Sequence, residues 1–405
     1  MGCLVVFTAA SVTAETGGRI YGRIETSDGN ELKGIIRWDR NEVSWVDLLN
    51  GTKEIKSEDI STTDGERRSR RRTSVKIFGI RINDNDWDWE GGNVSAASGI
   101  RMGHIRSLTP RRGDNVELVL KSGDTIELSS GSTDFGSDMR ELIIEDEREG
   151  ETELGWDDID KIEFLAVPAG ATSDLGERMY GTLSTRRGDQ FTGFVSWDAD
   201  ECLGGDVIDG EDRGRSRKIK LGRIASIERY SANGAEIKLT GGEDVVLKGT
   251  NDVDNSNRGI TIEDPNLGEV TVEWDEFDNL VFTKPTKVPL YSDFDGGRRL
   301  RGTVESEDGE KITGDIIWDQ DEAFTWEMLD GEARGARFKI EFGFVHKIDR
   351  DSYRGATVTL WDGRTFALRG SNDVDDSNKG ITIRQSGKKD VFVDWEDFRS
   401  VEFTK

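Results

Sequence analysis

A long internal repeat is the feature that most constrains how this chain of 405 residues can fold. Trp197 recurs as Trp318, and Trp274 recurs as Trp395, in both cases after 121 positions. The two copies align without insertion or deletion from Gly181 to the C-terminus, and the segments GTNDVDNSNRGITI and GSNDVDDSNKGITI match along their whole length. A chain of this kind is expected to fold as repeated units that pack on their neighbours.

A third copy precedes these two and carries an insertion. Its segment LKGIIRWDRNE matches FTGFVSWDADE and ITGDIIWDQDE of the later copies. Trp38 lies 159 positions before Trp197, whereas Trp156 lies 118 positions before Trp274, so the insertion has a net length of 41 residues. The prediction is therefore three domains, joined by connectors that contain proline. We call them copy 1 (15–165, with the insertion at about 60–100), copy 2 (177–284) and copy 3 (297–405).

Each copy contains two similar halves with the pattern of β-strands. The front half alternates apolar and polar residues on both sides of a turn, as in YGTLSTRRGDQFTGFVSW, and the back half opens in the same way with AEIKLTGGEDVVLKG. Two short alternating runs around a Gly/Asp turn are typical of a β-hairpin. Each half closes on a strand, a tight turn and a strand, which is similar to the end of SH3-like and Sm-like barrels. We therefore expect an all-β chain with two small five-stranded barrels or rolls in each copy.

Charge and residue types exclude several functional classes. The formal charge of −26 and the pI near 4.6 oppose contact with phosphate groups, so nucleic acid is not an expected partner. The chain has only two histidines, His104 and His346, at positions that are not equivalent in their copies, which argues against a histidine-based catalytic or zinc site. A phosphate-binding glycine loop and a nucleophile elbow are also missing from the sequence. We expect a chain that is not an enzyme.

The N-terminal residues resemble an export leader. An apolar run at 3–10, CLVVFTAA, is followed by Val12 and Ala14, which are placed like the −3 and −1 residues of a signal-peptidase site. We interpret residues 1–14 as this leader, although a buried first strand is the alternative. The predicted location is outside the cell, in the periplasm or in the cell envelope. No other apolar stretch approaches the roughly 20 residues that span a bilayer, so no transmembrane segment is expected in the mature chain.

Two equivalent loops offer closely spaced oxygen ligands that could hold calcium. Ca²⁺ prefers several oxygen ligands, and one loop can supply a number of them. The alternative is that Asp, Asn, Ser and Gly bend the chain through hydrogen bonds between side chains and backbone, and we favour this alternative. The candidate ligands are Asp252, Asp254 and Ser256 in copy 2, and Asp373, Asp375 and Ser377 in copy 3.

Three tryptophans have no counterpart in the other copies and are the candidates for exposed binding residues: Trp87, Trp89 and Trp361. The other eight recur at equivalent places, as core residues of a repeated fold would. Trp87 and Trp89 lie in the insertion, in the segment NDNDWDWE. An extended strand would place these rings on one face and four carboxylates on the other, as a further candidate cation site. The carboxylates are those of Asp84, Asp86, Asp88 and Glu90.

Together these features favour a non-catalytic, exported scaffold of tandem β domains that binds a protein or polysaccharide partner. The second hypothesis is a carbohydrate- or cell-wall-binding module that uses the unpaired tryptophans. A third is a hydrolase with a pair of carboxylates, because acidic residues are abundant throughout the chain.

Overall fold

The computed structural model describes residues 16–55, 76–77, 80–81, 94–130 and 132–405. These residues form three large antiparallel sheets and one short strand pair, connected by turns and short 3₁₀ helices, and they contain no α-helix. The prediction of an all-β chain is therefore confirmed. The predicted leader at 1–14 lies outside the described residues, as does most of the insertion, of which the short strands β4 (Lys76–Ile77) and β5 (Ile80–Arg81) are described.

Copy 1 forms one ten-stranded sheet in the order β11-β10-β2-β1-β12-β7-β8-β9-β3-β6. Period-2 alternation is visible in its burial pattern, for example in β8, where every second side chain is buried. The strands are β1 (Tyr21–Thr26), β2 (Glu31–Trp38), β3 (Leu48–Ile55), β6 (Val94–Arg101), β7 (Ile105–Arg111), β8 (Asn115–Leu120), β9 (Thr125–Ser129), β10 (Leu142–Asp146), β11 (Gly150–Leu154) and β12 (Ile159–Phe164), with 3₁₀ turns η1 (Met102–His104) and η2 (Trp156–Asp158).

Copy 2 repeats this strand order as β21-β20-β14-β13-β22-β17-β18-β19-β15-β16. The sequence repeat is thus a repeat of topology. The elements are β13 (Tyr180–Thr185), β14 (Gln190–Trp197), β15 (Val207–Asp212), β16 (Arg215–Lys220), η3 (Leu221–Arg223), β17 (Ile224–Ser231), β18 (Gly234–Leu239), β19 (Asp244–Lys248), η4 (Asn251–Val253), β20 (Ile260–Asp264), β21 (Gly268–Val272) and β22 (Phe277–Phe282).

Copy 3 has the same order, but its hairpin β25–β26 also extends the sheet of copy 2. β26 pairs with β21 of copy 2 along five residues. Within copy 3, an isolated β-bridge joins Glu332 of β25 to Arg369, the residue directly after β29. The elements are β23 (Arg301–Ser306), β24 (Lys311–Ile317), β25 (Met328–Ala333), β26 (Ala336–Glu341), η6 (Phe342–Phe344), β27 (Val345–Ser352), β28 (Gly355–Leu360), β29 (Thr365–Leu368), β30 (Ile381–Arg384), β31 (Val391–Val393) and β32 (Phe398–Phe403).

The two halves of each copy exchange their hairpins. In copy 1 the front hairpin β1–β2 pairs with β10 and β12 of the back half, and the back hairpin β8–β9 pairs with β7 and β3 of the front half. β7 and β12 pair with each other at the centre. Copies 2 and 3 show the same exchange. The strands of each copy therefore follow one continuous order, in which each half takes its hairpin from the other, and the described strands close into no barrel.

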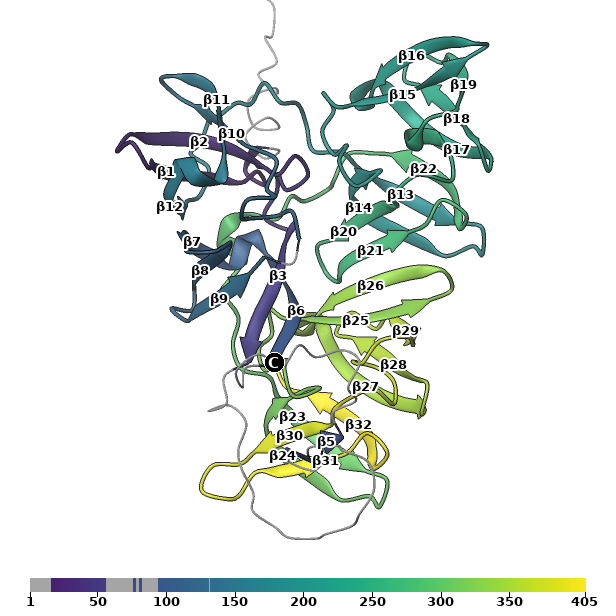
Figure 1. Ribbon diagram of the computed structural model, residues 1–405. Coiled ribbons are helices and arrows are strands. Elements are labelled where there is room, and N and C mark those ends of the chain that lie inside the picture. The colour runs from purple at the N-terminus through teal and green to yellow at the C-terminus, as the bar shows by residue number, and fades with distance from the viewer. Residues whose placement is uncertain (1–15, 56–75, 78–79, 82–93, 131) are drawn as a thin grey trace, which may run out of the picture.

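The three copies contact one another as one assembly (Figure 1). Copies 2 and 3 share one continuous hydrophobic core, and Trp326 of copy 3 packs into the core of copy 1. The connector between copies 2 and 3 crosses copy 1, where Tyr291 of η5 (Tyr291–Asp293) lies 4.5 Å from Trp45, measured between ring centroids.

The recurring tryptophans lie in the core, as the repeat predicts. Trp38 and Trp197 end the second strand of their copies, Trp318 directly follows it in copy 3, and all three are fully buried. Each indole N–H donates a hydrogen bond to a backbone carbonyl in a later loop of the same copy, which leads into the neighbouring strand. The acceptors are the carbonyls of Asp134, Asp252 and Asp373, at 2.5, 2.8 and 3.0 Å respectively. This bond fixes that loop against the strand end and so positions the acidic residues described next.

Candidate functional site

Most residues of the predicted tryptophan site lie outside the described part of the chain: Trp87, Trp89, Asp84, Asp86, Asp88 and Glu90. Their proposed roles stay predictions. Trp361 is described and half-buried. Its ring stacks on His346 with centroids 4.2 Å apart, and the ammonium of Lys405 lies 4.7 Å from the ring centroid. The ring is therefore already contacted by two side chains of its own copy.

The loops predicted as calcium sites divide their oxygen groups between two environments. Asp254 accepts hydrogen bonds from the backbone N–H and the hydroxyl of Ser256, and Asp375 and Ser377 make the same pair of bonds. This is the behaviour of turn-forming residues, which the sequence analysis favoured. The remaining candidate of each loop, Asp252 in copy 2 and Asp373 in copy 3, precedes the other two in the chain. It is buried, and its neighbours come from another part of the copy. Calcium binding by the loops themselves stays a prediction.

Asp252 belongs to a cluster of three carboxylates in copy 2. One oxygen each of Asp198, Glu201 and Asp252 lie within 4.8 Å of one another. We call this group the carboxylate cluster of copy 2. Asp198 and Asp252 are buried and Glu201 is half-buried. No histidine or cysteine belongs to the cluster, so its ligand chemistry is that of oxygen alone.

Local backbone geometry brings these three residues together. β14 ends at Trp197, and Asp198 and Ala199 follow in the left-handed region with φ of 48° and 67°. The resulting tight turn returns the chain so that the N–H of Glu201 donates to the carbonyl of Trp197 at 3.0 Å. Asp252 lies in η4, and its carboxylate accepts a hydrogen bond from the backbone N–H of Asp209 at 2.7 Å.

The same three residue types recur at the equivalent positions of copies 1 and 3. The segments are WDRNE, WDADE and WDQDE, each combined with one later aspartate in the loop that the tryptophan binds. The repeat aligns these segments, but no motif in the sequence marks them as a site. The clusters are Asp39, Glu42 and Asp134 in copy 1, and Asp319, Glu322 and Asp373 in copy 3, all of them buried.

The first aspartate of each cluster has a basic partner. Arg258 donates its backbone N–H and its guanidinium to Asp198, at 2.6 and 3.1 Å. Arg140 is the equivalent residue for Asp39, and the ammonium of Lys379 lies 3.7 Å from Asp319. The glutamate of each cluster has a buried oxygen, Oε2, without a hydrogen-bond partner.

Burial and mutual repulsion raise the pKa values of these carboxyl groups. Burial is the largest cause for Glu201, followed by the charges of Asp252, Asp198 and Asp200, and the pKa rises from 4.5 to about 8. The pKa values of Glu42 and Glu322 are raised well above 4.5 for the same reasons. Carboxyl groups in such an environment either share protons or require a positive charge from a ligand.

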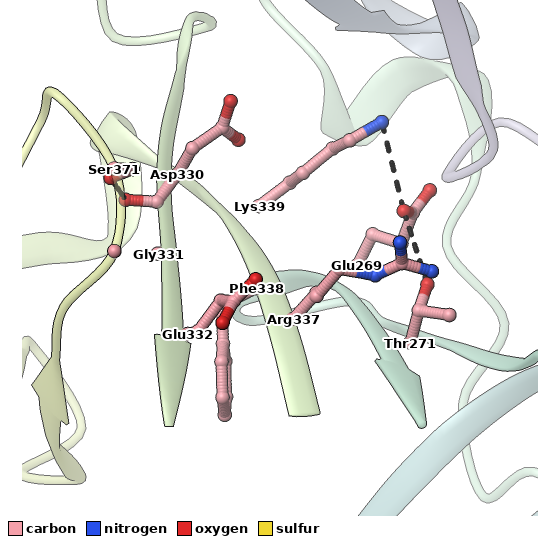
Figure 2. A pocket seen from close by; sticks show the side chains of 10 residues that line it. Glu269, Thr271, Asp330, Gly331, Glu332, Arg337, Phe338, Lys339 and Ser371 are labelled. Atoms are coloured by element: carbon pink, nitrogen blue, oxygen red, sulfur yellow. Dashed lines mark hydrogen bonds and ion pairs between the residues drawn. The ribbon is translucent and has the colours of Figure 1, made fainter. Parts of the chain in front are cut away.

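A separate pocket of about 390 Å³ lies where the sheet of copy 2 meets the hairpin of copy 3 (Figure 2). Its lining combines acidic side chains, including Glu269 and Asp330, with the basic side chains of Arg337 and Lys339. The ammonium of Lys339 lies 3.7 Å from Glu269, and it also donates to Asn50 of copy 1 at 2.8 Å. The three copies therefore meet beside this pocket, where Lys339 already pairs with Glu269.

Among the residues that the structure describes, no helix has the length and apolar character needed to cross a membrane. Comparisons of the chain with protein families, with curated proteins and with solved structures found no match.

Proposed function

We propose that this chain is a non-catalytic scaffold in which three β domains are fixed in one arrangement for a protein or polysaccharide partner. The observation that carries the proposal is a largely buried ion pair that recurs at the contacts between copies. One acidic position, equivalent in all three copies, accepts a basic side chain from another copy each time. The residues at this position are Asp47, Asp206 and Glu327.

The acidic residue at this position first organises its own copy. Asp47 accepts the backbone N–H groups of Val43 and Ser44 at 2.7 and 2.8 Å. Asp206 and Glu327 bind the two equivalent N–H groups of their copies in the same way. A carboxylate that holds two backbone donors has little freedom to move, so it presents its remaining acceptor sites in a fixed direction.

Each of these carboxylates then meets a cation from a different copy. Asp47 of copy 1 pairs with Arg178 of copy 2 at 3.1 Å. Asp206 of copy 2 pairs with Arg37 of copy 1, both oxygens being bound at 2.9 and 3.2 Å. Copies 1 and 2 thus each supply the acid of one pair and the base of the other. Glu327 of copy 3 pairs with Lys53 of copy 1.

Buried ion pairs of this kind favour one arrangement over others. The side chains of Arg178 and Asp47 are 5% and 4% exposed, so either charge would be costly without the other. A rotated arrangement of the copies would leave several such charges buried and unpaired. Together with the strand pairing between β21 and β26, the ion pairs support a rigid arrangement instead of independent domains on flexible connectors.

We further propose that each five-stranded group is an SH3-like or Sm-like roll. In copy 1 the first group has the order β11-β10-β2-β1-β12, and a 3₁₀ turn, η2, lies between its last two strands in the chain. The second group, β7-β8-β9-β3-β6, has η1 at the corresponding place between β6 and β7. This similarity of strand order carries no function of its own.

Differential scanning calorimetry of the full chain tests the scaffold. We expect one cooperative transition for the natural sequence, and a broadened or divided transition for the triple variant Asp47→Asn, Asp206→Asn, Glu327→Gln. The control variant replaces three exposed acids that pair within their own copies, Asp275→Asn, Glu307→Gln and Asp315→Asn, and should keep one transition. Separate transitions in the natural sequence would contradict the proposal, as would hydrolysis of generic polysaccharides by the protein.

A further inference from the structure

We propose that strand β16 of one molecule pairs with strand β11 of a second copy of this chain. The pairing repeats, between two molecules, the antiparallel pairing of β26 with β21 that connects copies 3 and 2 within the chain. We call the latter pairing the internal joint. The proposal goes beyond the scaffold function, which concerns contacts within one molecule.

Every copy contains both parts of such a joint, because the three copies share one strand order. The internal joint combines a strand at the end of a sheet, β21, with the outer strand of a hairpin, β26. We call β21 and its equivalents the receiving strands, and β26 and its equivalents the hairpin strands. The receiving strands are β11, β21 and β31, and the hairpin strands are β6, β16 and β26.

Among the described hairpin strands, β16 is the one without a neighbour on its outer side. β26 is used in the internal joint. β6 lies against copy 3, where a Cβ atom on Gly99 would be 3.6 Å from the side chain of Met328. β16 ends its sheet and pairs with β15 alone. The backbone groups on its outer side can therefore form hydrogen bonds with a further strand.

β11 is the receiving strand that remains open. The internal joint requires a glycine, because a Cβ atom on Gly268 would lie 2.0 Å from the carbonyl oxygen of Lys339. Lys389 occupies the equivalent position beside β31, so a side chain obstructs that edge. In copy 1 the position is Gly150, which has open space around it and begins β11. β11 ends its sheet and pairs with β10 alone.

The register of the internal joint places a lysine of β16 opposite a glutamate of β11. In the joint, Glu269 of β21 lies opposite Lys339 of β26, and their charged atoms are 3.7 Å apart. The equivalent residues are Glu151 in β11 and Lys218 in β16. Opposite charges at facing positions stabilise an antiparallel pair, whereas like charges there destabilise it. The same ion pair is therefore available between two molecules.

The two free edges carry charges of opposite sign over their whole length. Glu149 precedes β11 and would face Lys220 at the end of β16, while Glu153 adds a third acid to β11. These side chains, like those of Glu151 and Lys218, are exposed, and none has an ion-pair partner among the described residues. The net charge of −26 opposes association, but a Debye length of about 8 Å at physiological salt limits this repulsion.

The pairing between molecules should be weaker than the internal joint. Phe338 of β26 is buried, whereas its equivalent in β16 is Arg217, so less apolar surface is covered. Association is therefore expected to be reversible and to depend on concentration. In one molecule β11 and β16 lie apart, on copies 1 and 2 (Figure 1), so each strand must find its partner in another molecule.

Analytical ultracentrifugation of the full chain, from micromolar to millimolar concentration, tests the pairing. The average mass should rise above the 45.2 kDa of one chain. Glu151→Lys places two lysines opposite each other, and Lys218→Glu places two glutamates there, so each should raise the dissociation constant by at least about tenfold. The double variant restores opposite charges and should associate like the natural protein.

Matched controls change the net charge equally at exposed positions inside a sheet. Glu127→Lys in β9 and Lys238→Glu in β18 should leave association unchanged, because both strands have neighbours on each side. Circular dichroism shows that each variant is folded. Carbodiimide cross-linking of a mixture of isotope-labelled and unlabelled protein should join β11 of one molecule to β16 of the other.

Three results would overturn the proposal. The first is a natural protein that stays monomeric over the whole concentration range. The second is a double variant that associates as weakly as the single variants. The third is a set of cross-links between labelled and unlabelled chains that joins only strands other than β11 and β16.

Discussion

The ammonium nitrogen of Lys53 lies 2.5 Å from a carboxylate oxygen of Glu327, which is 274 positions further along the chain. Their side chains are 14% and 5% exposed. Burial alone would lower the pKa of Lys53, but the charges of Glu327, Glu322 and Asp321 raise it above its ordinary value. The lysine therefore stays charged, and the pair connects the first copy to the third.

Removal of this lysine should be costly. We expect Lys53→Met to lower the free energy of unfolding by about 3–5 kcal/mol, because Glu327 would keep a buried charge without its partner. The exposed pair of Arg301 and Asp315 is the control, and Arg301→Met should cost less than about 1 kcal/mol. Urea denaturation measures both values. Equal effects of the two substitutions would argue against a role of Lys53 in joining the copies.

Gly268 is the residue at which a side chain would separate copies 2 and 3. It has a φ of 140°, and a Cβ atom here would lie 2.0 Å from the carbonyl oxygen of Lys339 in β26. Gly268→Ala should therefore increase amide exchange in β21 and β26, as measured by hydrogen–deuterium exchange. Gly242 also has a positive φ but has open space around it, so Gly242→Ala should cost about 1–2 kcal/mol and leave exchange at the junction unchanged.

The raised pKa of Glu201 predicts how this residue makes stability depend on pH. Its carboxyl group titrates near 4.5 when unfolded and near 8 when folded, so between these values the folded state holds more protons. The contribution of this group to stability is then fully present below about pH 4.5 and is lost as the pH rises to about 8. Melting temperatures across this range should decline less steeply for Glu201→Gln. A pH dependence identical to that of the natural protein would exclude this group as a cause.

Residues 297–405 should fold as an isolated fragment, since copy 3 contains its complete set of strands. The fragment should be less stable than the same residues in the full chain, because Trp326 and Glu327 lose their contacts with copy 1. Circular dichroism is expected to show sheet structure with a cooperative thermal transition. A disordered spectrum would show that copy 3 depends on the other copies to fold.

Local patterns in the sequence predicted the all-β class and the buried position of the repeated tryptophans. Alternation of apolar and polar residues encodes a strand with one buried face, and it does so within five or six residues. Such local patterns do not predict the exchange of hairpins. The hairpins β1–β2 and β8–β9 have similar alternation, and either could pair with β3 or with β10 without any change in that pattern.

The carboxylate clusters were hidden for a different reason. Asp and Glu account for 81 of the 405 residues, so an acidic residue in a turn carries little information by itself. Glu201 and Asp252 are 51 positions apart, and only the folded strand β14 and the loop at η4 bring them together. The contacts between copies are long-range in the same way: Arg178 and Asp47 come from different copies, and no spacing within one copy predicts their pairing.

The exchanged hairpins restrict how a chain of this type can change in length. A half copy by itself contains a hairpin without its partner strands and a set of strands without its hairpin. A gene duplication or deletion of that size would expose unpaired strand edges, which promote aggregation. Gain or loss of an entire copy leaves every hairpin matched. The smallest unit that evolution or protein engineering can add or remove is therefore the full copy of ten strands.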